Sequence, residues 1–335
     1  MFFSQERIEK LWYADHPLKY FLIPVSWIYV VIISIRRFCY QAGILTVKEV
    51  DAPVIIVGNI SVGGTGKTPL VLWLVEHFRS KGLKPGIVSR GYGGIESAKP
   101  QQVRPDSNPK LVGDEPVLMA RNTLSPVAVA KKRRLAAEQL IKHYKCNLII
   151  CDDGLQHYNL GRDIEIAVID GVRRFGNNRC LPAGPLREPQ SRLKNCDMIV
   201  SKFKAGRHEY KMDYEYGDLI SLSNPEKQLK LSDLTGQQVH VIAGIGNPDS
   251  FFSYIRSHNI QVIKHEFSDH HLYSEEDIHF HDGLPVLMTE KDAVKCFSFA
   301  SQPHWYMPLK ANLSEAFTVR LENLMKDVID GQKVT

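Results

Sequence analysis

A glycine-rich stretch between a predicted strand and a predicted helix has the composition of a phosphate-binding loop. Residues 57–69 read V-G-N-I-S-V-G-G-T-G-K-T-P. Glycines let the backbone turn tightly and direct several N–H groups at one anion, and the following helix start adds positive potential. Lys67 would reach the β and γ phosphates of a nucleotide, and the Thr68 hydroxyl would bind Mg²⁺. The residues predicted to bind ATP are Gly63, Gly64, Thr65, Gly66, Lys67 and Thr68.

The loop departs from the strict pattern at its first position, where Ser61 stands in place of glycine. An ordinary glycine-rich turn is the alternative interpretation. The G-G-T-G-K-T core lies between a strand and a helix, as a phosphate-binding loop requires, and this context favours nucleotide binding.

Two carboxylates follow the apolar run 148–151, in the stretch D-D-G-L-Q-H. Enzymes with this kind of loop place an acidic residue that holds Mg²⁺ at the end of such a strand. Asp152 and Asp153 are therefore predicted metal ligands, although an Asp pair that caps a turn is the alternative. His157 would lie beside the phosphates or at a substrate.

The stretch G-D-E-P at 113–116 has two interpretations. Asp followed by Pro in the first turn is a common helix start. A kinase, however, needs a carboxylate that accepts or orients the proton of the acceptor hydroxyl. Asp114 or Glu115 could do this if the helix start faces the loop.

Basic residues also stand at two other predicted strand ends and in one loop between predicted strands. Arg90 could bind a phosphate and Tyr92 could pack on a sugar, unless S-R-G-Y-G-G is only a flexible turn. The run K-K-R-R at 131–134 is either a solvated face or an anion site, because cations are unfavourable at a helix start. Arg187 and Glu188 lie in a rigid Pro/Gly loop, where a structural ion pair is the alternative to a substrate contact.

The stretch D-H-H at 269–271 follows a predicted strand late in the chain. Adjacent histidines are poorly spaced for one metal ion. A histidine that shares a proton with a carboxylate across a cleft is more natural here, and a surface histidine is the alternative. The stretch T-E-K-D at 289–292 also ends a predicted strand, and the sequence assigns it no step.

These stretches are positioned by strands and helices that alternate from residue 53 onward. The pattern predicts an α/β protein with a parallel, doubly wound sheet like that of P-loop NTPases, and with ligands beyond the carboxyl ends of its strands. The predicted organisation is an N-terminal membrane-associated segment (1–40), a P-loop kinase core (41–205), a linker forming a small β hairpin (206–235) and a smaller second α/β domain (236–335).

The N-terminal segment is strongly apolar. Residues 21–35 carry no charged side chain, and two arginines close the run. A spanning helix needs about 20 apolar residues. Three interpretations remain: a monotopic helix in one leaflet, a short single span, and a buried core helix. Trp27 and Tyr29 suit a membrane interface. A nucleotide site immediately downstream places the bulk of the protein in the cytoplasm.

The composition fits a globular enzyme. The chain has 335 residues, of which 44% are hydrophobic and 24% charged, enough for one large or two ordinary domains. The net charge of +5 fits anionic substrates or an anionic membrane surface and demands neither. No nucleic-acid partner is predicted, and no protein partner is evident. The six cysteines form no C-x-x-C pair, which indicates free thiols in a reducing compartment.

The combination of stretches is more specific than any one of them. It closely resembles the tetraacyldisaccharide 4'-kinase family, the lipid A 4'-kinases of Gram-negative bacteria, over roughly residues 10–325. The stretches that carry the resemblance are, in order, the hydrophobic N-terminal segment, G-N-I-S-V-G-G-T-G-K-T-P, S-R-G-Y-G, G-D-E-P, D-D-G-L-Q-H, L-P-A-G-P-L-R-E-P, D-H-H and T-E-K-D-A-V-K.

The resemblance implies a fold, a reaction and residue roles. It implies two P-loop-like α/β domains joined by a small β linker. The reaction is transfer of the ATP γ-phosphate to the 4'-hydroxyl of a tetraacylated glucosamine disaccharide 1-phosphate, at the cytoplasmic face of the inner membrane. Asp114 would be the base and His270 its partner from the second domain. The metal-handling residues would be Thr68, Glu115, Asp152 and Asp153. The substrate-side candidates are Arg90, Tyr92, Arg134, His157, Arg187 and Glu188.

Two other functions use the same kind of loop. A membrane-associated regulatory NTPase would hydrolyse the nucleotide and move a partner, and a ligase would form a phosphorylated intermediate. The second domain and the G-D-E-P and L-P-A-G-P-L-R-E stretches favour an acceptor site instead.

Overall fold

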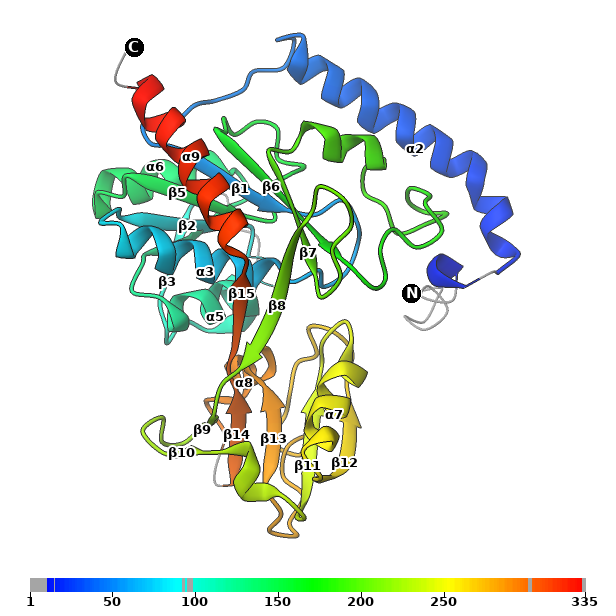
Figure 1. Cartoon of the computed structure of the whole chain (residues 1–335), viewed down its shortest axis with the longest axis vertical. Helices are drawn as coiled ribbons and strands as arrows, with labels where there is room; N and C mark the ends of the chain where they lie inside the picture. Colours follow the sequence, from blue (N-terminus) through cyan, green and yellow to red (C-terminus); the bar gives the residue numbers. More distant parts are fainter. Residues whose placement is uncertain (1–10, 15, 92–93, 95–98, 301–302, 333–335) are drawn as a thin grey trace.

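The chain folds into two α/β units placed end to end, with a long helix along one edge of the larger unit (Figure 1). This computed structural model describes residues 11–14, 16–91, 94, 99–300 and 303–332, so that Tyr92 lies outside the described residues. The larger unit is built on a nine-stranded sheet and the smaller unit on a six-stranded sheet. The predicted α/β class, with two mostly parallel sheets and an apolar N-terminal helix, is confirmed.

The nine-stranded sheet has the order β15-β8-β7-β6-β1-β5-β2-β4-β3. All neighbours are parallel except β15, which is antiparallel to β8, and β3, which is antiparallel to β4. Its strands are β1 (Val54–Gly58), β2 (Pro85–Ser89), β3 (Gln101–Val103), β4 (Val127–Val129), β5 (Leu148–Asp152), β6 (Ile164–Asp170), β7 (Met198–Lys202), β8 (Tyr210–Tyr216) and β15 (Leu309–Leu313).

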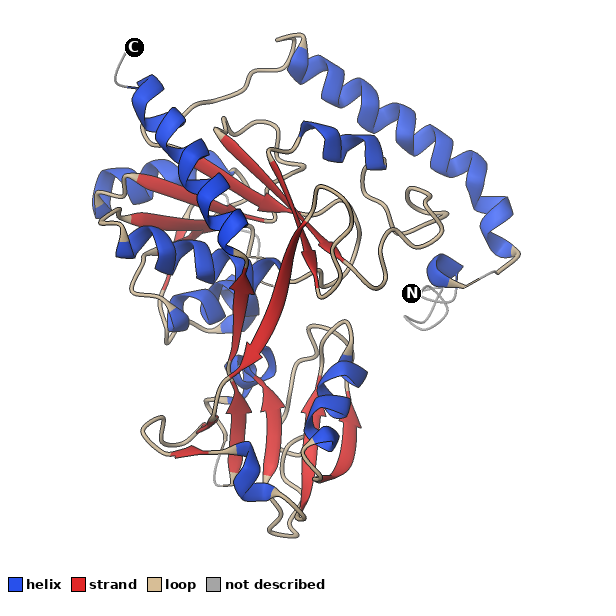
Figure 2. Cartoon of the chain, viewed as in Figure 1, coloured by secondary structure: helices blue, strands red, loops and turns tan. Residues whose placement is uncertain are grey.

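Helices cover both faces of this sheet, as Figure 2 shows. Because side chains alternate along a strand, Ile55 and Val57 of β1 face one apolar cluster and Val54 and Ile56 face the other. The first cluster includes α3 (Lys67–Ser80), α5 (Asp114–Asn122) and α9 (Glu315–Gln332), and the second includes α6 (Arg133–Tyr144) and η1 (Gln190–Asn195). Burial on both faces explains why the central strands are continuous apolar runs.

The smaller sheet has the order β10-β9-β14-β13-β11-β12. The strands β14, β13, β11 and β12 are parallel to one another. The strand β9 pairs antiparallel with β14, and β10 pairs antiparallel with β9. Its elements are β9 (Leu219–Ser221), β10 (Gln228–Leu229), η2 (Leu231–Leu234), β11 (Gln238–Ala243), α7 (Pro248–Ser257), β12 (Gln261–Glu266), β13 (Val286–Thr289), α8 (Glu290–Cys296) and β14 (His304–Met307).

The chain crosses between the two units twice, and this differs from the predicted domain boundaries. Residues 206–235 do not form a separate linker: β8 joins the large sheet, and only the β9–β10 hairpin belongs to the small one. Residues 309–332 leave the second unit, because β15 pairs with β8 and α9 packs on the large sheet. The two crossings are tied where the Gly217 N–H donates to the Pro308 carbonyl, at 3.0 Å. Strand periodicity does not reveal which sheet a strand joins, so the sequence pattern missed this return.

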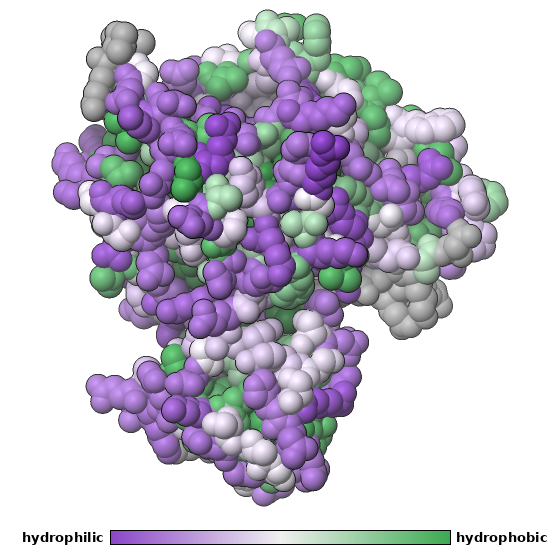
Figure 3. Space-filling model, in the orientation of Figure 1, coloured by the Kyte–Doolittle hydropathy of each residue, from purple (hydrophilic) through white to green (hydrophobic). Residues whose placement is uncertain are grey.

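The N-terminal helix α2 spans Leu18–Gln41, so it extends beyond the uncharged run 21–35 at both ends. Residues 19–41 are long and apolar enough to cross a membrane by length and composition. Only 6% of the most apolar window is buried, which rules out the core-helix interpretation. Figure 3 shows apolar side chains along this edge of the molecule. The exposed ones on α2 are Tyr20, Phe21, Val25, Trp27, Ile28, Val31, Ile32, Ile35 and Phe38.

The return of the chain predicts that the C-terminal helix stabilises the large unit. Phe317 of α9 is fully buried and packs edge-on against Trp73 of α3, with ring centroids 5.5 Å apart. We expect Phe317→Ala to lower the free energy of unfolding by about 3–5 kcal/mol, because it opens a cavity under the sheet. Chemical denaturation measures this. Val319→Ala on the same helix is the control, since Val319 is 52% exposed. Equal effects of the two substitutions would contradict the packing of α9.

Candidate active site

The glycine-rich loop lies between the end of β1 and the start of α3, as predicted. Gly63 and Gly66 have φ angles of 107° and 92°, a region that L side chains rarely adopt. A Cβ on Gly66 would also lie 2.1 Å from the Tyr214 hydroxyl, so only glycine fits there. Gly63 and Gly64 are exposed, and a Cβ built on either meets no described atom within 4 Å. The loop therefore presents its backbone to open space beside Lys67, where phosphates could lie.

Asp152 and Asp153 end β5 beside this loop but have opposite environments. Asp152 is buried and accepts a hydrogen bond from the Ser89 hydroxyl at 3.3 Å. Burial, followed by the negative charge of Glu115, raises the pKa of Asp152 to about 7. Asp153 contacts Lys67 at 3.3 Å and Arg187 at 3.0 Å. Burial would raise its pKa, but the two cations outweigh this and hold the pKa of Asp153 at about 2.

Asp114 is the first residue of α5, and the structure brings it to His270 of the second unit. Gly113, with a φ of 93°, separates α5 from the short helix α4 (Pro109–Val112) and sets the direction of the Asp114 side chain. The His270 Nδ1 lies 2.9 Å from Asp114 Oδ2. Burial works to raise the pKa of Asp114, but the hydrogen bond from His270 and the charge of Lys291 bring it to about 2. The same hydrogen bond raises the pKa of His270.

The ionised state of Asp114 fixes the role of its partner. A carboxylate can only accept hydrogen bonds, so the proton between the two groups belongs to His270 Nδ1. The other ring nitrogen of His270 lies 3.8 Å from Asp269 Oδ2. An imidazole between two carboxylates is readily protonated, and it can share a proton with Asp114.

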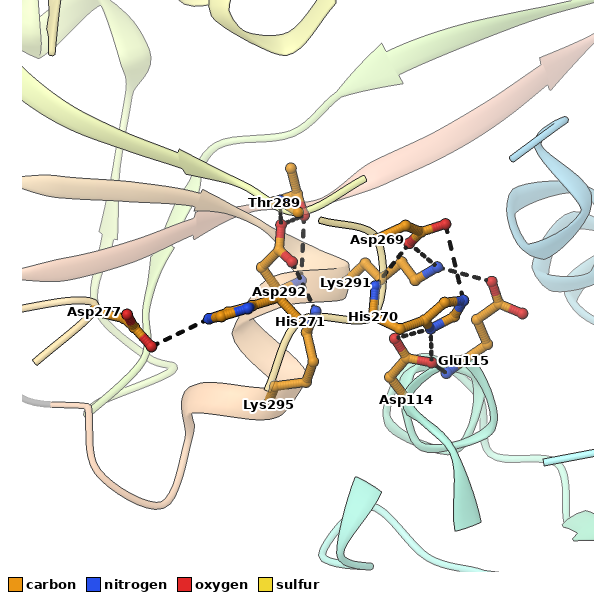
Figure 4. Close-up of polar contacts among 11 residues, drawn as sticks. Asp114, Glu115, Asp269, His270, His271, Asp277, Thr289, Lys291, Asp292 and Lys295 are labelled. Atoms are coloured by element: carbon orange, nitrogen blue, oxygen red, sulfur yellow. Dashed lines mark hydrogen bonds and ion pairs between the residues drawn. The ribbon is translucent and has the colours of Figure 1, made fainter. Parts of the chain in front are cut away.

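The unassigned stretch T-E-K-D supplies further contacts between the units (Figure 4). Lys291 Nζ lies 3.0 Å from Glu115 Oε1 of α5 and 3.0 Å from Asp269 Oδ1. Glu290 accepts a hydrogen bond from the Asn122 amide at 2.8 Å. The first turn of α8 therefore docks on α5. Sequence reasoning missed Lys291, because nothing in its local pattern shows what a lysine at a strand end faces.

The other half of that stretch has a structural role inside the second unit. Thr289 caps α8, since its hydroxyl accepts from the Asp292 N–H at 3.2 Å. The fully buried Asp292 carboxylate accepts from the Thr289 hydroxyl, from the Gly244 N–H and from Lys295. This network fixes where α8 begins and thereby where Lys291 stands.

The residues present fit a magnesium ion. Asp152 Oδ1 is buried and has no hydrogen-bond partner among the described residues, and Glu115 is close enough to raise the pKa of Asp152. A divalent cation would relieve both conditions. No set of three or more His, Cys, Asp or Glu side chains in the described part of the chain forms a metal cage. Mg²⁺ is commonly bound by one or two carboxylates, substrate phosphates and water, so no such cage is needed.

Four arginines lie near enough to His157 for their charges to act on it. Burial, together with the charges of the arginines, lowers the pKa of His157 to about 4. These residues are Arg133, Arg162, Arg36 and Arg90. Within the described chain, His157 Nε2 and Arg133 Nε have no hydrogen-bond partner. Such a cluster of cations is suited to a phosphate.

The basic run at 131–134 contributes a different residue from the one predicted. Arg133 is buried beside His157, whereas Arg134 pairs with Glu138 one turn further along α6, where both side chains are partly exposed. Helical geometry points adjacent residues about 100° apart, so a run of basic residues does not show which one faces inward.

Arg187 and Glu188 also separate. Arg187 faces the site through its ion pair with Asp153. Glu188 is buried, where it accepts hydrogen bonds from Gln156 at 2.9 Å and from the Tyr158 hydroxyl. Glu188 therefore anchors the loop that carries Arg187. Its buried surroundings suit a structural role and not a contact with substrate.

The second unit approaches the glycine-rich loop at one point. Gly246, in the connection from β11 to α7, packs so near that a Cβ on it would lie 3.4 Å from the Gly64 nitrogen. A cavity of about 760 Å³ opens beside the Asp114–His270 pair, lined by residues of both units. The large unit thus carries the glycine-rich loop and the buried Asp152 carboxylate, whose Oδ1 has no partner among the described residues, and the Asp114–His270 pair joins this unit to the second one. Together with the doubly wound fold, they define a P-loop phosphotransferase.

Comparisons with known proteins identify the particular kind. The chain matches the family described as Tetraacyldisaccharide-1-P 4'-kinase over residues 18–326, and it belongs to this family of phosphotransferases. Relatives called tetraacyldisaccharide 4'-kinase include one from Methylobacillus flagellatus, 48% identical over 96% of this chain and 98% of the relative. Another, from Nitrosococcus oceani, is 45% identical over 95% of this chain and 94% of the relative.

A solved structure shares the fold. The crystal structure of LpxK from Aquifex aeolicus in complex with ATP superposes with a TM-score of 0.79 at 29% identity. The match covers 93% of this chain and 99% of that one.

The opposite environments of the two aspartates predict opposite effects of neutralising them. Because the folded-state pKa of Asp152 is raised, its favourable contribution is complete below about pH 4 and is lost as the pH rises through 7. Asp152→Asn should therefore raise the Tm at pH 8, with a difference that shrinks by pH 5. The pKa of Asp153 is lowered, so its contribution is present above about pH 4 and lost on acidification. Asp153→Asn should lower the Tm at pH 8.

Thermal unfolding at both pH values, with EDTA and without nucleotide, measures these shifts. Each variant is the control for the other, since the substitutions are chemically identical and adjacent. Loss of stability in both variants at pH 8 would show that the two carboxylates do not differ as described.

Proposed function

We propose that the protein transfers the γ-phosphate of ATP to the 4'-hydroxyl of a tetraacylated glucosamine disaccharide 1-phosphate, a step in lipid A biosynthesis. The observation that carries this proposal is the Asp114–His270 pair, held at 2.9 Å between the large unit and the second unit. A hydrolytic switch needs only to orient water, whereas an ionised carboxylate beside an accessible cavity suits a hydroxyl acceptor. The family membership and the apolar helix point to the same acceptor.

The nucleotide side of the reaction depends on positioning and charge. Lys67 and the loop amides would hold the β and γ phosphates, and Thr68, Asp152 and Glu115 would hold Mg²⁺, with Asp153 orienting Lys67. Bound Mg²⁺ would neutralise charge on those phosphates. Lys67 is already held within 3.3 Å of Asp153, so its ammonium is placed before a nucleotide arrives.

The acceptor side needs a base. Asp114 would take the proton from the 4'-hydroxyl as the hydroxyl oxygen forms a bond to the γ phosphorus. The bond from the γ phosphorus to the β-phosphate oxygen breaks at the same time, which releases ADP. His270 keeps Asp114 ionised and oriented, and it can share the proton that Asp114 receives. In this pair the carboxylate is the base, and the histidine orients it.

The 1-phosphate of the acceptor needs a cationic site. The best candidates are the arginines around His157, of which Arg90 and Arg36 come from different parts of the chain.

We further propose that α2 docks on the cytoplasmic face of the inner membrane as a monotopic helix. Its inner side is hydrogen-bonded to the large unit along its length: Ser26 donates to the Cys180 carbonyl, Tyr29 to that of Arg187, and Arg36 to that of Gln156. A helix held this way lies along the protein surface and is not free to cross a bilayer. Its exposed apolar side can enter one leaflet.

One assay tests the function. ATP, Mg²⁺ and the purified disaccharide lipid are incubated with the protein, and the product is scored for a new phosphomonoester on the lipid. Release of inorganic phosphate without a lipid product would instead favour a regulatory NTPase.

Removing the base should separate catalysis from binding. We expect Asp114→Ala to lower kcat by at least about 10²–10⁴-fold, the range for loss of a general base, with ATP affinity nearly unchanged. His270→Ala should lower kcat less, because Asp114 remains. His271→Ala is the matched control, since His271 pairs with Asp277 within the second unit at 3.2 Å. Turnover near the wild-type level in Asp114→Ala would remove Asp114 from the mechanism.

The exposed face of α2 should control membrane binding. Phe21, Ile28 and Ile32 are each more than half exposed. Burying one such side chain contributes about 1.5–3 kcal/mol, so replacing all three by Ser should weaken vesicle binding by at least about 100-fold. Co-sedimentation with lipid vesicles measures this, and the KM for the lipid acceptor should rise. Leu124→Ser is the control, because Leu124 is 85% exposed but lies in the connection after α5, away from α2 in the chain. Unchanged vesicle binding by the triple variant would exclude this docking mode.

A further inference from the structure

Lys291 joins the two units through carboxylates of both. Its ammonium lies 3.0 Å from Glu115 of the large unit and 3.0 Å from Asp269 of the second unit. Its side chain is only 18% exposed. Figure 4 shows it pointing from the start of α8 toward the first turn of α5, between Asp269 and Glu115. This contact is part of the interface on which the Asp114–His270 pair depends.

The position of Lys291 is not explained by its own helix. It lies in the first turn of α8, where a cation is electrostatically unfavourable. Lys295, one turn later on the same helix, has an internal partner in Asp292 at 3.0 Å. Lys291 instead reaches out of its unit, and the adjacent Glu290 does the same toward Asn122. The first turn of α8 is therefore arranged for contact with α5.

Glu115 interacts with both a cation and a second carboxylate. Its carboxylate is already paired with Lys291. Its charge also acts on Asp152, whose own Oδ1 has no partner in the described part of the chain. Glu115 and Asp152 are thus close enough for their charges to act on each other, and a cation bound by both would compete with the Lys291 ammonium for Glu115.

We propose that Lys291 is a positioning residue that occupies Glu115 until Mg²⁺ takes that carboxylate, and that its second ion pair keeps Asp269 and His270 seated on Asp114. This inference rests on the proposed function. Lys291 thereby couples metal binding at the loop to the placement of the second unit. Mg²⁺ has to displace Lys291 from Glu115, and the same lysine side chain keeps His270 in place beside Asp114.

The proposal predicts two effects of opposite kind in Lys291→Met. Loss of the competing cation should lower the Mg²⁺ concentration for half-maximal nucleotide binding by about three- to tenfold, the range for a partly buried ion pair. Loss of the seat for Asp269 should lower kcat, with the KM for ATP little changed. A residue that only stabilised the fold would not improve the response to Mg²⁺.

The experiment titrates Mg²⁺ against binding of a fluorescent ATP analogue to the full-length protein, without acceptor lipid. Lys291→Arg retains the cation and should behave as wild type. Lys295→Met is the matched control on the same helix: it should lower the Tm but leave the Mg²⁺ response unchanged. Lys291→Gln serves if Lys291→Met unfolds, because its amide can still bond to Asp269 without carrying charge.

The outcomes distinguish the two proposals. A lower Mg²⁺ requirement with lower kcat in Lys291→Met supports the role of Lys291, and so does a lower Mg²⁺ requirement in Lys291→Gln, whose amide can still hold Asp269. An unchanged requirement overturns it, and so does a higher one, which would assign Lys291 to the nucleotide itself. If the wild type forms no phosphorylated lipid, the proposed function fails, while the Mg²⁺ titration still reports on Lys291.

Discussion

A buried carboxylate at the start of α5 remains ionised only because the second unit places cations against it. Asp114 is almost fully buried, and burial by itself favours its neutral form. His270 and Lys291 reverse this, and both belong to the smaller unit. An Asp114 carboxylate that is both buried and ionised therefore needs the two units together. If Asp114 is the base, as proposed, the interface is a condition for the reaction as well as a source of stability.

The same principle distinguishes the two aspartates at the end of β5. They are adjacent in sequence. Asp152 is buried near other carboxylates, whereas Asp153 lies between Lys67 and Arg187. The first is suited to a metal ion and the second to orienting a cation. Two identical side chains receive different tasks because the αL conformation of Asp153, with a φ of 49°, turns the chain sharply between them.

The helix α2 links an exposed apolar surface to the loops around the glycine-rich loop. Its inner side donates hydrogen bonds to carbonyls of Arg187 and Gln156, which lie in the two loops that flank the glycine-rich loop. Its outer side is apolar and exposed. An acceptor held in a leaflet would thus be presented beside the site without leaving the lipid surface. The two crossings at Gly217 and Pro308 leave the second unit attached to the large sheet on the other side.

The sequence by itself determined the fold class, the glycine-rich loop and most of the strands and helices, because these depend on local features: apolar periodicity, glycine at positive φ and helix starts. Tertiary structure alone decided the return of β15 and α9, the inward direction of Arg133 in place of Arg134, and the anchoring role of Glu188. It also decided the use of Lys291, which meets Glu115 across 176 residues of chain. The energy of such contacts comes from burial and from charges brought together by the whole fold, and it leaves no pattern in the residues on either side.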